Sequence, residues 1–146
     1  MNVARLVLAA VAATVVDAVY GFAVYGVLLA GEFARYPGVY RPNDVGMTYL
    51  PLMFVGVFIG MLVAAMIYAK GYEGGSGVAE GARFGILLGV FIAAIFAGVN
   101  YATLNIGRRH SLEMAVAGLV EWTLAGIAIG LVYGPAATAA RRGAGV

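Results

Sequence analysis

The chain contains no cysteine, one histidine, one tryptophan and four prolines. Without cysteine it has no disulfides, thiolate nucleophiles, iron–sulfur clusters or cysteine-based zinc sites. Charged residues make up 11% of the chain, whereas about 25% is typical of a soluble domain. The nine Lys and Arg residues are scattered over the ends of apolar segments and form no basic face. This pattern argues against a nucleic-acid partner.

Apolar residues account for 63% of the chain, and the mean hydropathy is +0.95. They gather in four stretches, each long enough to cross about 30 Å of hydrocarbon as a helix. Apolar residues lie all round these segments instead of alternating with polar ones, which favours helices over the strands of a membrane barrel. We therefore expect an all-α integral membrane protein, a single four-helix bundle over residues 1–146. The expected spans are residues 6–30, 49–69, 83–104 and 114–134.

With four spans, both termini lie on the same side of the membrane. The basic residues divide almost evenly between the two sides, but the pair Arg141 and Arg142 follows the last span. By the positive-inside rule this pair favours cytoplasmic termini. We expect a bacterial inner (plasma) membrane protein oriented in this way.

Glycines spaced four residues apart recur in three of the four spans. Such pairs lie on one helix face and let a neighbouring backbone approach closely. Their recurrence suggests two helical hairpins related as a parallel repeat, although a chain with 22 glycines gives some matches by chance. These faces could pack within one chain or between copies, so we expect a homo-oligomer or a subunit of a membrane complex, surrounded by lipid. The expected packing glycines are Gly56, Gly60, Gly85, Gly89, Gly126 and Gly130.

Two acids, Asp17 and Glu121, fall where the middle of a bilayer should be. A charged acid at that depth costs about 2.5–3.5 kcal/mol on insertion scales, so each needs a partner, a proton or a cavity. On antiparallel spans their depths agree within roughly 6 Å. Tyr20 and Asn100 are the expected neighbours of this group. It could serve as a proton or cation site, or it could simply hold helices together through hydrogen bonds.

The remaining polar residues suggest little chemistry. His110 stands beside Arg108 and Arg109, where we expect solvent or lipid headgroup contacts, because one nitrogen ligand cannot hold a metal alone unless a second copy supplies another. Glu80 and Arg83 are expected to form an ion pair. No serine has a histidine base, and no phosphate loop or paired metal-ligand motif occurs. We therefore expect no enzyme activity, no cofactor and no metal.

Residues 80–85 with Gly89, and residues 126–133, resemble sequences in small four-span bacterial inner-membrane families of uncharacterised function. The resemblance covers the second half of the chain and implies a fold without an activity. Asp17 also occupies a place comparable to the essential acid in the first span of small multidrug-resistance transporters. That acid is a glutamate in a shorter chain, so the second likeness is an analogy.

Two functions fit these observations. One is a non-enzymatic scaffold or accessory subunit of a membrane assembly, with a capacity to bind lipid. The alternative is a small proton- or cation-coupled transporter that uses the intramembrane carboxylates of Asp17 and Glu121.

Overall fold

The computed structural model describes the backbone of residues 2–143 and the side chains of residues 2–42 and 44–134. These residues form helices and no strand. In chain order they are α1 (Val3–Gly21), the π-helix η1 (Phe22–Leu28), α2 (Ala30–Phe33), α3 (Asn43–Thr48), α4 (Leu50–Gly71), α5 (Gly77–Thr103) and α6 (Arg108–Gly143). Four segments are long and apolar enough to cross a membrane: Val3–Leu28, Leu50–Gly71, Gly77–Thr103 and Arg108–Gly134. The expected all-α, four-span bundle is confirmed.

The third span begins at Gly77 instead of Arg83, so the connection before it is shorter than expected. Ser76 caps the first turn of α5 by accepting a hydrogen bond from the Ala79 N–H. Glu80 accepts hydrogen bonds from the backbone N–H groups of Glu73 and Gly75, which closes the turn between α4 and α5. The expected ion pair between Glu80 and Arg83 is therefore wrong.

The helices α5 and α6 pack backbone against backbone. A methyl group on Gly81 or Gly85 would collide with the main chain of α6, and one on Gly126 would collide with Gly81 and Gly85. The contact continues toward the chain termini, where Gly77 meets Gly130. A side chain at any of these positions would force the two helices apart, because the space that it needs is already filled by peptide groups.

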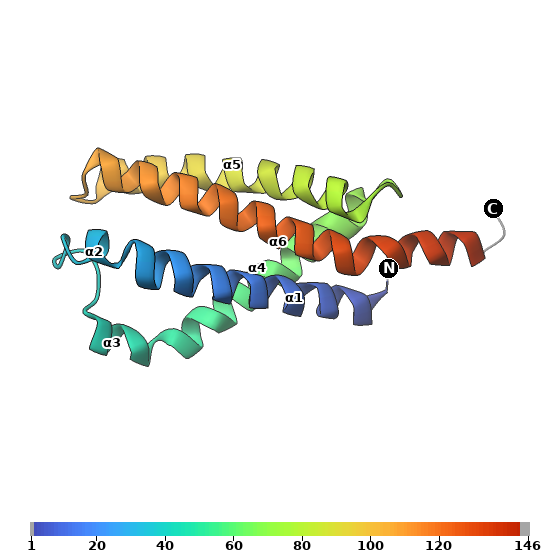
Figure 1. Cartoon of the computed structure of the whole chain (residues 1–146), viewed down its shortest axis with the longest axis horizontal. Coiled ribbons are helices and arrows are strands. Elements are labelled where there is room, and N and C mark those ends of the chain that lie inside the picture. Colours follow the sequence, from blue (N-terminus) through green and yellow to red (C-terminus); the bar gives the residue numbers. More distant parts are fainter. Residues whose placement is uncertain (1, 144–146) are drawn as a thin grey trace.

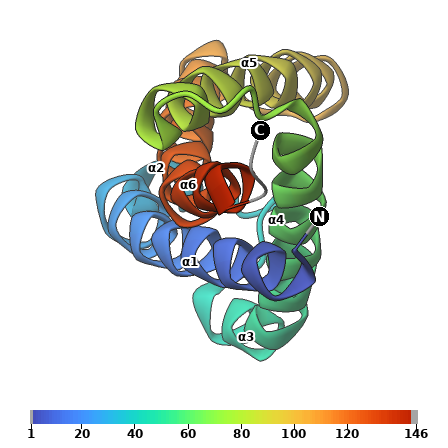
Figure 2. The same ribbon diagram turned by 90° about the vertical axis from the view of Figure 1, so that its right-hand side faces the viewer.

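The helix α6 lies between α5 on one side and α1 with α4 on the other, and α4 crosses obliquely to α1 (Figures 1 and 2). Small side chains let α1, α4 and α6 approach one another, and the larger Met61 and Ile129 fill the space that remains. The buried residues of this core are Leu6, Ala9, Ala10, Ala13, Met61, Ala64, Ala65, Tyr68, Tyr72, Ala125, Ala128, Ile129 and Tyr133.

The glycines of α4 behave differently from those of α5 and α6. A methyl group on Gly56 or Gly60 would meet no other described part of the chain within 4 Å. The hairpin of α1 and α4 is held by alanines and larger side chains, whereas the hairpin of α5 and α6 is held by glycines. The two hairpins therefore do not pack alike, and the expected equivalence of their glycine faces does not extend to α4.

The start of α1 and the far end of α6 lie at the same end of the bundle, together with the α4–α5 turn (Figure 1). We call this the termini end. The opposite end holds α2, α3, the segment between them and the α5–α6 connection, and we call it the loop end.

The glycine contact can be tested on one helix. Gly85→Ala should destabilise the protein by about 1–3 kcal/mol, because the added methyl has no space against α6. Gly98→Ala on the same helix, where a methyl meets nothing within 4 Å, should change stability by no more than about 1 kcal/mol in either direction. Reversible denaturation in detergent, followed by Trp122 fluorescence, measures both. Equal losses in the two variants would contradict the packing described here.

Candidate functional site

Asp17 on α1 and Glu121 on α6 lie close enough for their carboxyl groups to share a hydrogen bond. Each residue is half-buried and lies near the middle of its membrane span. The fourth span begins at Arg108 instead of Met114, which moves Glu121 from a third of the way along that span to its middle. The structure thus brings together the two acids that the sequence singled out.

The closeness of the two carboxyls has a chemical consequence. Two carboxylates are acceptors only, so a hydrogen bond between them needs a proton on one of them. The Tyr25 hydroxyl donates a second hydrogen bond to Glu121 Oε2, at 2.8 Å. Asp17, Glu121 and the Tyr25 hydroxyl thus form one polar group near the middle of the membrane spans.

The hydrogen bond to Glu121 comes from Tyr25 and not from Asn100, the partner that the sequence suggested for it. The Tyr20 hydroxyl donates to the Ala117 carbonyl, at 2.9 Å, and this hydrogen bond connects α1 to α6. In a continuous α-helix Tyr25 would lie about 80° around the axis from Asp17. The wider turns of the π-helix η1 advance each residue by a smaller angle, which returns Tyr25 toward the face of Asp17.

A pocket of about 210 Å³ lies beside Glu121, lined by residues of α5, α6, η1 and the loop end. Glu121 and Tyr25 line its inner part, and Asn100, Ser111 and Tyr40 line it nearer the loop end. Asn100 therefore belongs to the same pocket as Glu121, although the hydrogen bond to Glu121 comes from Tyr25. The rest of the lining is mainly apolar, with Phe96 and Trp122 as its largest members.

A second polar group surrounds His110 at the loop end. His110 has no exposed surface, and its Nε2 lies 2.8 Å from the Tyr40 hydroxyl. The rings of Phe33, Tyr36 and Tyr40 enclose it, with centroids 5.1, 5.0 and 5.5 Å from its own. Burial, together with Tyr36, raises the pKa of Tyr40 above its ordinary value, so this hydroxyl keeps its proton. The expectation that His110 contacts solvent or headgroups is wrong.

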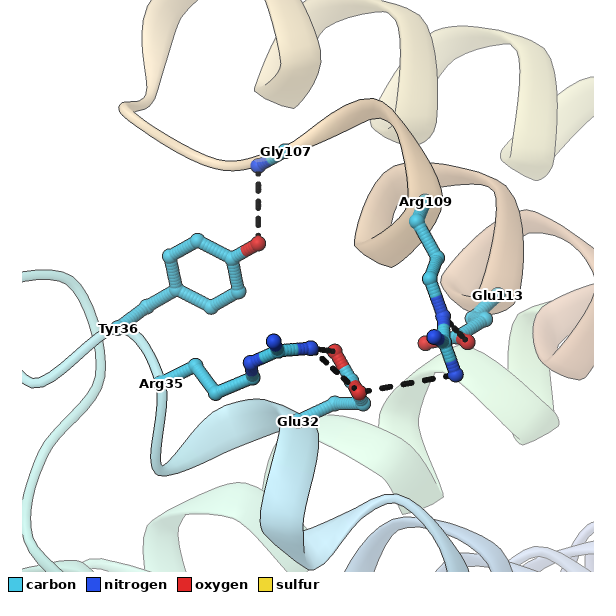
Figure 3. Close-up of polar contacts among 6 residues, drawn as sticks. All are labelled: Glu32, Arg35, Tyr36, Gly107, Arg109 and Glu113. Atoms are coloured by element: carbon cyan, nitrogen blue, oxygen red, sulfur yellow. Dashed lines mark hydrogen bonds and ion pairs between the residues drawn. The ribbon is translucent and has the colours of Figure 1, made fainter.

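The carboxylates of Glu32 and Glu113 adjoin His110. Arginines pair with both carboxylates (Figure 3). Arg109 lies 2.8 Å from Glu113 and 3.7 Å from Glu32, and Arg35 lies 3.0 Å from Glu32. Tyr36 closes the group by accepting a hydrogen bond from the Gly107 N–H, at 3.1 Å. These contacts attach the loop containing α2 to the start of α6.

The arginines differ from each other in their surroundings. Arg109 pairs with Glu113 and Glu32, but its side chain is 74% exposed, so its headgroup contact stays a prediction. Arg108 is exposed, and its headgroup contact also stays a prediction.

Several residues of these groups escaped the sequence analysis, among them Tyr25, Glu32 and Glu113. Glu113 could have been found from the sequence, because it follows His110 by three residues and therefore lies on the same face of a helix. Glu32 could not, since only the folded chain brings α2 to the start of α6.

Comparison with protein-family models, with curated proteins and with solved structures found no match for this chain. The arguments on function therefore rest on the residues of the chain itself.

The shared proton can be tested by infrared spectroscopy of the protein in lipid. At neutral pH the wild type should show the carbonyl band of a protonated carboxylic acid, because the hydrogen bond between Asp17 and Glu121 requires one. The band should disappear in the double variant Asp17→Asn with Glu121→Gln. It should remain in Asp44→Asn, which changes an exposed acid of α3. A wild-type spectrum without this band would show that the two carboxyls do not share a proton.

Proposed function

We propose that the protein is a non-enzymatic membrane transporter of protons or small cations, with Asp17 and Glu121 as its binding site. One observation carries this proposal: Glu121 adjoins Asp17 and also lines the pocket. Acids that only held helices together would have no need of a cavity beside them. An acid that exchanges a proton or binds an ion requires such access.

The pocket supports a route from one side of the membrane. Ser111, near the start of α6, and Glu121 both line it, and they are separated by about 15 Å along the helix axis. Tyr40, Asn100 and Ser111 supply polar groups along that length. The lining of the pocket therefore extends from residues of the loop end to Glu121.

The chemistry of the pair suits exchange of one positive charge for another. When a cation enters, it can take the place of the shared proton between the two carboxyls, so the total charge of the site stays the same. Tyr25 keeps its hydrogen bond to Glu121 in both states and orients that carboxyl. A site with a single negative charge is tolerated in hydrocarbon better than one with two.

Flux in proteoliposomes tests this function directly. Wild-type protein should carry protons or Na⁺ down an imposed gradient, and Asp17→Asn and Glu121→Gln should each reduce the flux to that of protein-free liposomes. Asp44→Asn, which lies outside the pair, should transport like the wild type. If the two membrane variants fold and transport like the wild type, the acids have no part in transport and the proposal fails.

The alternative is a scaffold or accessory subunit that assembles through α4 and binds lipid over its apolar surface. The observation that favours it is the open face at Gly56 and Gly60, where no described part of the same chain approaches. Ile59 and Val63 beside them are 56% and 46% exposed. A second copy of this chain would place an equivalent glycine face there, which is the geometry of a membrane-helix dimer.

Oligomeric state distinguishes this alternative. Gly60→Leu should convert a dimer in mild detergent into a monomer, because the larger side chain prevents close approach of two α4 helices. Gly98→Leu, at an open glycine of α5, should leave the dimer intact. Light scattering with cross-linking in membranes measures both. A wild-type monomer, or a dimer that both variants preserve, would exclude assembly through α4.

A further inference from the structure

We propose that Glu32, His110 and Glu113 form a binding site for a divalent first-row transition-metal ion at the loop end. One donor atom from each residue lies within 4.8 Å of the others. Zinc binds nitrogen and oxygen donors at about 2.0–2.2 Å, so its ligand atoms lie at most about 4.4 Å apart. Small side-chain rotations of the two glutamates close the difference. His110 and Glu113 already share one face of α6, and α2 supplies Glu32.

Unsatisfied buried atoms point to a missing partner at this place. His110 is completely buried, and its Nδ1 has no hydrogen-bond partner among the described residues. The Oε2 atom of Glu113 is likewise buried and without a partner in the described part of the chain. Native structures rarely leave such atoms unpaired unless an ion or water satisfies them. A metal ion between them would satisfy both.

The second nitrogen of His110 fits a metal-binding role. Histidine ligands usually donate their other ring N–H to a fixed acceptor, which sets the tautomer and the orientation of the ring. Here Nε2 lies 2.8 Å from the Tyr40 hydroxyl, and three aromatic rings hold the imidazole in place. With Nε2–H donating to Tyr40, the lone pair of Nδ1 is left for the ion.

The donor set selects a class of metal. One imidazole nitrogen with two carboxylates suits Zn²⁺, Mn²⁺ or Fe²⁺, whereas Mg²⁺ and Ca²⁺ prefer ligands that are all oxygen. Three protein ligands leave a further position for water. We take Zn²⁺ as the probe.

Arg35 and Arg109 compete with the ion for the same carboxylates. Their side chains are 62% and 74% exposed, so both can turn into solvent when a cation supplies the positive charge instead. This competition predicts how the metal affinity changes in an arginine variant, which a purely structural ion-pair network does not. Removing an arginine should strengthen metal binding.

The experiment uses the full chain in detergent without a histidine tag. Zn²⁺ titration by calorimetry should reveal a single saturable site, and Co²⁺ should give the visible absorption of a protein-bound ion. Glu32→Gln, Glu113→Gln and His110→Gln should each weaken Zn²⁺ binding by about tenfold or more. Asp44→Asn, an exposed acid at the same end, should bind like the wild type. Arg109→Gln should bind more tightly than the wild type.

Several outcomes would overturn the site. Absence of Zn²⁺ binding by the wild type does so. So does equal binding by the wild type and all three ligand variants, which would indicate an adventitious ion only. If His110→Gln does not fold, as judged by circular dichroism, the two glutamate variants and the Co²⁺ spectrum decide the matter. Unchanged or weaker binding by Arg109→Gln would also count against the proposal. None of these measurements depends on transport.

Discussion

The contact between the backbones of α5 and α6 is the constraint on which the rest of the structure depends. Because Gly81 and Gly85 meet Gly126 directly, the rotation of α6 about its own axis is fixed by peptide groups and not by adaptable side chains. The opposite face of α6 then turns toward α1, and Glu121 meets Asp17 across that interface. The same rotation places His110 beneath the loop that contains α2. The positions of Glu121 and His110 on α6 therefore both depend on the glycine contact between α5 and α6.

Hydropathy and length were sufficient to predict four spans, because apolar runs of this length have few alternatives in a membrane. The predicted start of the third span was wrong, because the glycines before Arg83 were expected to form a flexible loop. Gly77 and Gly81 lie in a segment rich in glycine that resembles a loop, yet they continue the four-residue spacing of Gly85 and Gly89 and pack on α6. Glycine favours a loop when nothing contacts it, and it favours close helix packing when a second backbone is present. Sequence alone does not reveal which neighbour exists, and for this reason Gly56 and Gly60 were expected to resemble the others.

The acids were predictable because a charge in hydrocarbon is costly wherever it occurs, and antiparallel helices match the depths of Asp17 and Glu121. Tyr25 was not predictable, since its position depends on a π-helix that changes the rotation of the chain after Gly21. The cluster around His110 was even less predictable from the sequence. Glu32 joins it through tertiary folding, and the ring positions of Phe33 and Tyr40 follow from the path of the same loop.

The two polar groups are joined by aromatic side chains in contact. The ring of Tyr25 lies 6.4 Å from Phe33, and Phe33 lies 4.7 Å from Tyr40 and 5.1 Å from His110, measured between centroids. Tyr25 and Tyr40 also line the pocket, one beside Glu121 and the other at the loop end. Because little free volume separates packed rings, displacing one ring requires its neighbours to shift as well. The contacts that hold the imidazole of His110 in place therefore also hold Tyr40, and with it the shape of the pocket at the loop end.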